Sequence, residues 1–129
     1  MRRSLVRASL CASLLALIAT ACSLPTSAAP SPTSWDSQLV DVGGYRLFLQ
    51  CSGEGSPTVI LESGGGADSA AWLEVMRGID PTTRVCAYDR ANLGRSDSTT
   101  SPRTYREMTR DLQALLDNAH IGGPYILAG

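Results

Sequence analysis

The sequence lacks features that nucleic-acid-binding and membrane-spanning proteins need. Its 11 basic and 12 acidic residues leave a formal net charge of -1, so the basic surplus of nucleic-acid-binding domains is absent. The apolar segment Leu10 to Ala21 is too short for a comfortable transmembrane helix. The chain has a single histidine, His120. We therefore expect no nucleic-acid partner. The hydrophobic content of 43% over 129 residues is that of an ordinary globular protein.

The amino end has the pattern of an export signal. Arg2, Arg3 and Arg7 precede the apolar segment, and Ala19-Thr20-Ala21 precedes Cys22. A positive stretch, a short apolar core and a small-residue cleavage site are typical of a secretory signal peptide, which we predict at residues 1–21. The same tripeptide fits a bacterial lipobox, in which Cys22 would be lipidated and would anchor the protein. Because Arg2-Arg3 also fits a twin-arginine signal, the export route stays open.

Two further segments follow the predicted signal peptide. Residues 22–35 are rich in Pro, Ser, Thr and Ala, a composition typical of an extended tether. Residues 36–129 are predicted to fold. We therefore expect an exported domain, either secreted or held at the cell envelope as a lipoprotein, that contacts a membrane only through a lipid at Cys22.

The central stretch of the folded part is a strand, a glycine turn and a helix start. Thr58 to Leu61 is apolar and β-branched, which favours a buried strand. Ser63-Gly64-Gly65-Gly66 favours a tight turn with bare N–H groups, and Asp68 or Ser69 can cap the next helix. In open α/β sheets, ligands bind at the carboxyl ends of the strands. We therefore expect Gly64 to Gly66 to line a site.

The other elements complete an α/β pattern. Gly43-Gly44 predicts a hairpin between strands at residues 38–42 and 45–51, and residues 84–88 and 124–129 read as later strands. Thr104 and Glu107 form a capping box for a helix. That helix is expected to bury one apolar face, made of Tyr105, Met108, Leu112, Leu115, Leu116 and Ala119.

Together these pieces resemble the α/β-hydrolase family over residues 36–129. The resemblance rests on the strand ending in Leu61-Glu-Ser-Gly-Gly-Gly66, the loop from Tyr88 to Ser96, the helix at Thr104, and Tyr125-Ile-Leu-Ala-Gly129. The family often has His-Gly where this chain has Ser63-Gly64. It often has Asp-x-Arg-Gly-x-Gly-x-Ser where this chain has Asp89 to Ser96 with Arg90 directly after the aspartate.

The resemblance implies a fold and a mechanism. The fold would be the amino-terminal half of a hydrolase sheet, with antiparallel first strands, then parallel strands with helices. The nucleophile of the family stands in Gly-x-Ser-x-Gly after the fifth strand, and backbone N–H groups stabilise the oxyanion. Gly65 matches the family's donor residue, although the glycines could serve the turn alone. The resemblance also implies the residues that line the site, namely Ser63, Gly64, Gly66, Asp89 and Arg90.

The catalytic triad itself is not found in residues 1–129. No Gly-x-Ser-x-Gly occurs, and Gly129 looks like the first glycine of that motif. His120 precedes the last strand, so we expect a helix-end residue and not a catalytic base. The sheet is thus expected to be incomplete, in a fragment inactive by itself. Its parent would hydrolyse an ester or related bond of a small-molecule substrate without a cofactor or a metal ion.

The family's strand order also bears on the cysteines. It places the second strand beside the fourth, so Cys51 and Cys86 would lie on neighbouring strands, and an exported protein can keep a disulfide there. Two buried thiols are the alternative. In the loop, Asp89 and Arg90 could pair and hold the backbone beside the site.

Two other functions stay open from the residues. Gly64-x-Gly66 with Asp89 about twenty residues later is similar to a dinucleotide-binding fingerprint, although Ser69 stands where the third glycine belongs. The missing triad also allows an exported binding domain without catalytic activity.

Overall fold

The computed structural model describes residues 35–129. The predicted signal peptide, Cys22 and nearly all of the tether lie outside the described residues. Within residues 35–129, none of the helices has the length and apolar character needed to cross a membrane.

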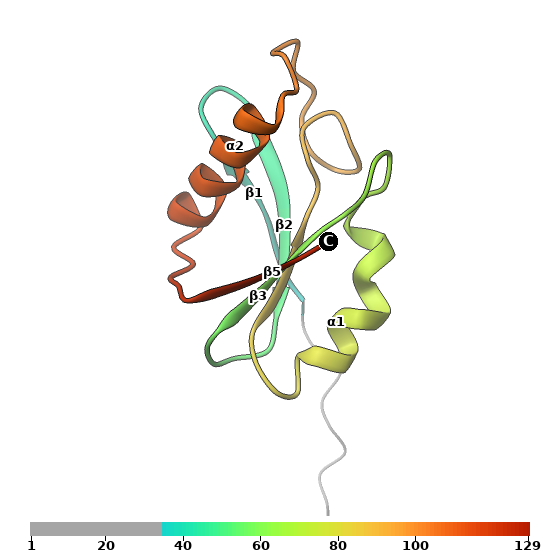
Figure 1. Cartoon of the computed structure of the whole chain (residues 1–129), viewed down its shortest axis with the longest axis vertical. Helices are drawn as coiled ribbons and strands as arrows, with labels where there is room; N and C mark the ends of the chain where they lie inside the picture. The colour runs from blue at the N-terminus through green and yellow to red at the C-terminus, as the bar shows by residue number, and fades with distance from the viewer. Residues whose placement is uncertain (1–34) are drawn as a thin grey trace, which may run out of the picture.

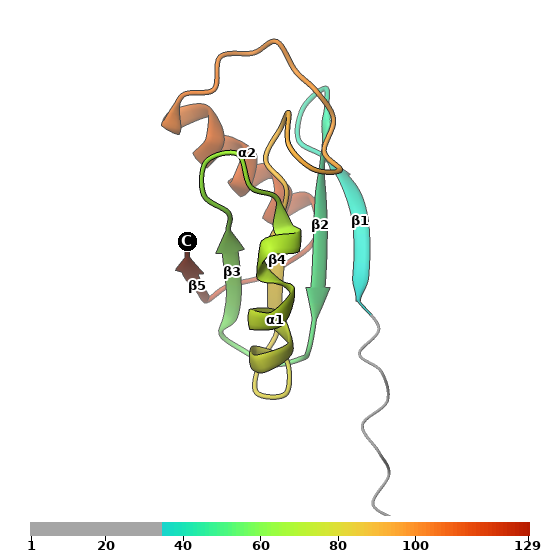
Figure 2. The ribbon, with the colours of Figure 1, turned by 90° about the vertical axis from the view of Figure 1, so that its right-hand side faces the viewer.

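A five-stranded mixed sheet forms the centre of the molecule. In the order β1-β2-β4-β3-β5, the first two pairings are antiparallel and the last two are parallel (Figure 2). This arrangement confirms the predicted α/β class, with antiparallel strands first and parallel strands after them. The strands are β1 (Asp36–Asp41), β2 (Arg46–Ser52), β3 (Thr58–Glu62), β4 (Val85–Tyr88) and β5 (Tyr125–Ala128).

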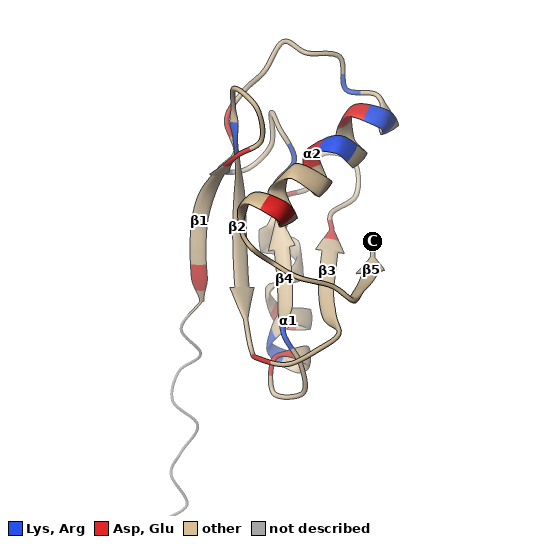
Figure 3. Cartoon of the chain, turned by 90° about the vertical axis from the view of Figure 1, so that its left-hand side faces the viewer, with Lys and Arg blue, Asp and Glu red and all other residues tan. Residues whose placement is uncertain are grey.

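Helices cover opposite faces of this sheet (Figure 1). A 3-10 turn, η1 (Ser69–Trp72), leads into α1 (Leu73–Ile79) on one face, and α2 (Tyr105–Asn118) lies on the other. Charged residues lie on the helices, in loops and at strand ends, so the middle of the sheet is uncharged (Figure 3). Parallel strands that are covered on both faces need such apolar sequences.

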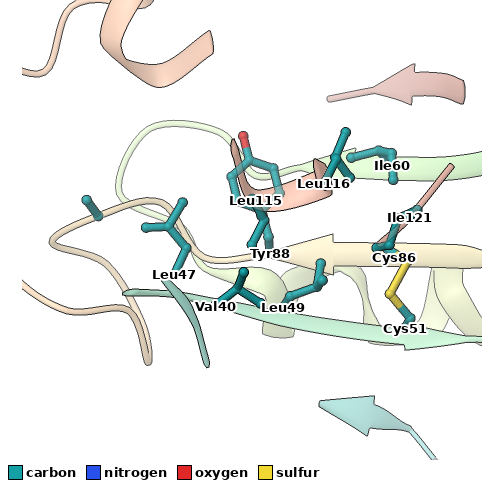
Figure 4. Packing of buried hydrophobic residues seen from close by; sticks show 11 residues of the cluster. Val40, Leu47, Leu49, Cys51, Ile60, Cys86, Tyr88, Leu115, Leu116 and Ile121 are labelled. Atoms are coloured by element: carbon teal, nitrogen blue, oxygen red, sulfur yellow. A yellow bond between two sulfur atoms is a disulfide. The ribbon is translucent and has the colours of Figure 1, made fainter. Parts of the chain in front are cut away.

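The core has one apolar cluster on each face of the sheet. Strand β3 contributes to both, because its successive side chains point to opposite faces. Ile60 packs on the α2 side with Leu115 and Leu116 (Figure 4), whereas Leu61 packs on the α1 side with Met76. The alternation of β3 therefore holds both helices to one strand.

A disulfide joins β2 to β4 inside the α2-side cluster (Figure 4). Cys51 and Cys86 are direct partners in the antiparallel register, and their Cα atoms lie 4.1 Å apart. The predicted bridge is confirmed, and the alternative of two free buried thiols is wrong.

Helix α2 begins as predicted, and its expected apolar face packs on the sheet except at Tyr105: Leu115 and Leu116 are buried, and Leu112 and Ala119 pack against the same cluster. The Thr104 hydroxyl accepts a hydrogen bond from Glu107 N at 3.4 Å, as a capping residue does. Tyr105 was expected in the apolar face, but it is 87% exposed because it stands in the first turn at the mouth of an open cavity. Asp111 is instead buried, and it accepts a hydrogen bond from the Tyr45 hydroxyl at 2.7 Å and pairs with Arg103.

The end of α2 accounts for His120. After the C-cap residue Ala119, His120 has a left-handed φ of 55°. His120 N donates to Asp117 O at 3.1 Å and Ile121 N donates to Leu116 O at 2.9 Å, the two bonds of a Schellman motif. His120 is therefore an exposed helix-end residue, as predicted, at a position that favours glycine.

We predict that His120→Gly stabilises the protein. Glycine removes the cost of about 1–2 kcal/mol that a side chain adds in the left-handed conformation, but loses part of this gain to backbone entropy. Urea melts of the full-length protein should show a gain of about 0.5–1 kcal/mol in the free energy of unfolding. His120→Ala is the control, because it keeps the left-handed strain. Equal stability of the two variants would contradict the prediction.

Candidate functional site

The glycine turn after β3 is a tight turn closed by a backbone hydrogen bond and by the hydroxyl of the preceding Ser63. Ala67 N donates to Gly64 O at 3.2 Å, and Gly66 has a φ of 79°, the pattern of a type II turn. The buried Ser63 hydroxyl donates to Asp68 O at 2.7 Å. The positive φ explains why glycine is needed at Gly66. Gly64 and Gly65 have no positive φ, so backbone conformation does not require glycine at these two positions.

Gly65 presents its backbone N–H without a partner. Among residues 35–129, no acceptor takes a hydrogen bond from this N–H, and Gly65 is exposed. A Cβ built at Gly64, Gly65 or Gly66 would meet nothing within 4 Å. The turn therefore leaves Gly65 N–H available to a ligand, which is what an oxyanion donor requires. Its role as that donor stays a prediction.

The helical turn that follows the glycine turn is fixed by Asp89. This carboxylate is 1% exposed, and it accepts hydrogen bonds from Ser69 N at 2.6 Å and from Arg95 N at 2.8 Å. Arg95 Nε lies 3.8 Å away. Asp68, as predicted, caps the following helical turn by accepting from Ala70 N at 3.0 Å. Asp89 therefore ties the start of this helical turn to the loop that follows β4.

The expected pair between Asp89 and Arg90 is wrong. Neighbouring residues that continue a strand point to opposite faces, so the two side chains diverge. Asp89 reaches Ser69 on the α1 side, whereas Arg90 Nη1 lies 3.8 Å from Met108 Sδ on the α2 side. Arg90 Nη2 donates to Gly64 O at 2.7 Å. Arg90 also lies beside Glu62, with 3.7 Å between Nη1 and Oε1.

A cavity of about 530 Å³ opens between the carboxyl ends of β3 and β5 and the first turns of α2. Ser63, Gly64 and Arg90 supply its polar lining, and Met108 and Leu112 supply apolar lining. Tyr88 lies close to Glu62, and burial, followed by this carboxylate, raises the pKa of Tyr88 above its ordinary value. The Tyr88 phenol therefore stays neutral at physiological pH.

Gly129 follows β5 and lies beside Glu62 at the end of β3. A Cβ built on Gly129 would lie 2.8 Å from Glu62 O, so only glycine fits this approach. The structure thus brings together Ser63, Gly64, Arg90 and Gly129 around one cavity. Gly65 and Gly66, which were also expected to line the site, lie beside the cavity and not in its lining, and Asp89 bonds Ser69 on the other face. His120 lies at the opposite end of α2 from Met108, away from this cavity. No group of three potential metal ligands occurs within residues 35–129.

Sequence reasoning missed three residues at this site. Glu62 faces Arg90, Met108 contacts the same guanidinium, and Gly94 has a φ of 50° against Asp89. Glu62 did carry a signal, since it is the one charged residue at the end of an otherwise apolar strand. Gly94 carried another, because a glycine in a polar loop often marks a left-handed conformation.

We predict that Gly94→Ala destabilises the protein far more than Gly66→Ala. Both glycines are left-handed, but a Cβ on Gly94 would lie 2.6 Å from Asp89 Cγ, whereas one on Gly66 would meet nothing within 4 Å. Urea melts should show a loss of about 1–2 kcal/mol for Gly66→Ala and about 2–5 kcal/mol for Gly94→Ala. Losses of the same size would contradict the role of the Gly94–Asp89 contact.

Solved structures show the same arrangement of elements. A bromoperoxidase from Bacillus anthracis matches with a TM-score of 0.65 at 20% identity, over 73% of this chain and 34% of that protein. The enol-lactonase from Burkholderia xenovorans LB400 matches with a TM-score of 0.64 at 24% identity, over 71% and 37%. At these identities the likeness shows the fold.

Curated relatives point to more than one kind of protein. No family model matches the sequence. An "AB hydrolase superfamily protein" of Gibberella zeae is 39% identical over 87 residues, which are 63% of this chain and 27% of that protein. The "Probable transporter efuK" of Hormonema carpetanum is 44% identical over 97 residues, 70% of this chain and 14% of that protein.

Both sets of matches involve only part of each longer protein. The chain spans 14% of the length of the first curated relative, 38% of the second, and about a third of each of the two solved structures. Residues 36–129 have the fold of the α/β-hydrolases, over the part that forms the first strands, the glycine turn and the two flanking helices.

Proposed function

We propose that residues 36–129 are the amino-terminal part of a hydrolase domain, in which Gly65 N–H stabilises an oxyanion. The observation that carries this proposal is the unpartnered Gly65 N–H in a turn beside the cavity and the end of β5. A hydrolase-named relative and the hydrolase fold support it. The substrate would be a small molecule with an ester or related bond.

Hydrolysis of an ester is favoured by a hydrogen-bond donor that is already in place before the nucleophile attacks. Attack on a carbonyl carbon moves negative charge onto its oxygen, and a fixed N–H stabilises this charge by roughly 3 kcal/mol without reorganising. The nucleophile of such enzymes stands on a sharp turn after a strand. The close approach of Gly129 to Glu62 is consistent with such a turn directly after β5.

The geometry does not favour dinucleotide binding. That function would need an accessible carboxylate after β4 to accept from a ribose hydroxyl. Asp89 is 1% exposed, and both of its oxygens already accept backbone N–H groups. A ribose could reach this carboxylate only if the loop came apart.

A second candidate is a non-catalytic module of a larger membrane-associated protein. Its support comes from one relative named as a transporter, the "Probable transporter efuK", and one named as a membrane protein, an "Uncharacterized vacuolar membrane protein" of Saccharomyces cerevisiae (strain YJM789), which is 36% identical over 103 residues. The matched segments are 14% and 16% of these proteins, so most of each protein lies outside the match.

The hydrolase proposal predicts activity in a chimera. Residues 1–129 alone should hydrolyse p-nitrophenyl acetate only at the buffer rate, since they hold no nucleophile turn. Residues 36–129 in place of the matching 37% of the enol-lactonase should support lactone hydrolysis. In that chimera, Gly65→Pro should lower turnover by roughly 10²–10³-fold, because it removes the donor at a turn position that accepts proline.

Gly65→Ala is the matched control in the chimera. It keeps the N–H, and its Cβ meets nothing within 4 Å, so turnover should stay close to that of the unsubstituted chimera. Two results would contradict the proposal: a chimera that melts cooperatively yet is inactive, or one in which Gly65→Pro and Gly65→Ala turn over equally.

We further propose export, with a lipid at Cys22. The arginines, the apolar segment and Ala19-Thr20-Ala21-Cys22 support this, and the Cys51–Cys86 disulfide fits an oxidising compartment. In a bacterial host, a fatty-acid probe should label the full-length protein and should not label Cys22→Ala. Cys11→Ser is the control, because this cysteine would leave with the signal peptide. If Cys22→Ala is labelled as strongly as the unsubstituted protein, or if neither is labelled, the anchor at Cys22 is excluded. Cell fractionation would then test secretion alone.

A further inference from the structure

Arg90 contacts three elements around the glycine turn. Its Nη2 donates to Gly64 O at 2.7 Å, its Nη1 lies 3.7 Å from Glu62 Oε1 at the end of β3, and the same nitrogen lies 3.8 Å from Met108 Sδ on α2. The side chain is 19% exposed. The guanidinium is thus a planar, five-donor group held against β3 and α2, with one donor aimed at the turn.

The contact with Gly64 O fixes more than one atom. The peptide between Gly64 and Gly65 is planar and trans, so the Gly64 carbonyl and the Gly65 N–H point in opposite directions. A donor that holds the carbonyl therefore also sets the direction of the N–H. Arg90 lies on the carbonyl side, which directs the Gly65 N–H away from the guanidinium.

Packing cannot hold this peptide instead. Gly64, Gly65 and Gly66 have no side chains that could pack, and a Cβ built on any of them would meet nothing within 4 Å. Successive glycines rotate freely, so a turn made of them stays mobile unless hydrogen bonds restrain it. Gly64 O has two donors, Arg90 Nη2 at 2.7 Å and Ala67 N at 3.2 Å. The shorter of the two is the bond from Arg90, which lies in the loop after β4 and not in the turn itself.

We propose that Arg90 is a positioning residue that sets the direction of the Gly65 N–H through its hydrogen bond to Gly64 O. The catalytic meaning of this role rests on the proposed oxyanion function of Gly65. Asp89 holds the helical turn that follows, where it accepts from Ser69 N at 2.6 Å. Two adjacent residues after β4 therefore hold the glycine turn and the start of η1 from opposite faces of the sheet.

The test is NMR spectroscopy of the ¹⁵N-labelled full-length protein with Arg90→Ala. We expect the order parameter of the Gly65 amide to fall from about 0.85 to below about 0.6, with a change in its chemical shift, while amides in β2 and β4 keep their values. Ethylguanidinium should move the Gly65 resonance of Arg90→Ala back toward its original position, and ethylammonium should not, because only the planar fork reproduces the lost donor.

Arg77→Ala is the matched control, since it removes the same charge from α1 and its partner there is Glu74. If Arg90→Ala fails to fold, Arg90→Lys carries the test, because it keeps the charge without the planar fork. Gly65 amide parameters that are unchanged in the folded variant, or a uniform change in all amides, would overturn the proposal. The NMR measurement does not depend on catalytic activity. An inactive chimera would therefore contradict the hydrolase function without deciding whether Arg90 orients the Gly65 N–H.

Discussion

The buried carboxylate of Asp89 is the interaction on which the site depends most. A charge that is 1% exposed would be strongly destabilising without partners, and here two backbone N–H groups and Arg95 supply them. Arg95 is itself held, because its guanidinium lies 3.4 Å from the centroid of the Phe48 ring and donates to Gln50 Oε1 at 3.2 Å. The loop after β4 is thereby tied to β2 as well as to the glycine turn.

This arrangement places a flexible functional segment on a rigid support. The glycine turn has almost no side chains of its own, so its geometry depends on groups that reach it from elements packed in the core. The strand alternation after β4 sends Asp89 to one face and Arg90 to the other, so one dipeptide supports both the glycine turn and the helical turn that follows it. The mixed sheet keeps β3 and β4 in fixed register, so the distance between turn and supports is set by the sheet.

Sequence patterns predicted the elements well and the side-chain partners poorly. The capping box at Thr104 and Glu107 and the strand at Thr58 follow from local rules, so they could be identified in isolation. The partners of Asp89 and Arg90 depend on which way each side chain points after β4, and the burial of Asp111 depends on Tyr45 sixty-six positions away. The Cys51–Cys86 pairing needed the strand order of a family, because cysteine spacing does not reveal register.

The disulfide has a topological consequence for the site. It closes a covalent ring whose arc, between Cys51 and Cys86, contains β3, the glycine turn, η1 and α1. Asp89 and Arg90 follow the second cysteine and so lie just outside this ring, but they accept from Ser69 N and donate to Gly64 O within it. A single cut by a protease within the arc would open the ring without releasing either piece, so the two halves would stay linked until a reductant acted. The exposed turn that carries Gly65 lies within this arc, so a cut there would damage the site while the disulfide kept the two pieces together.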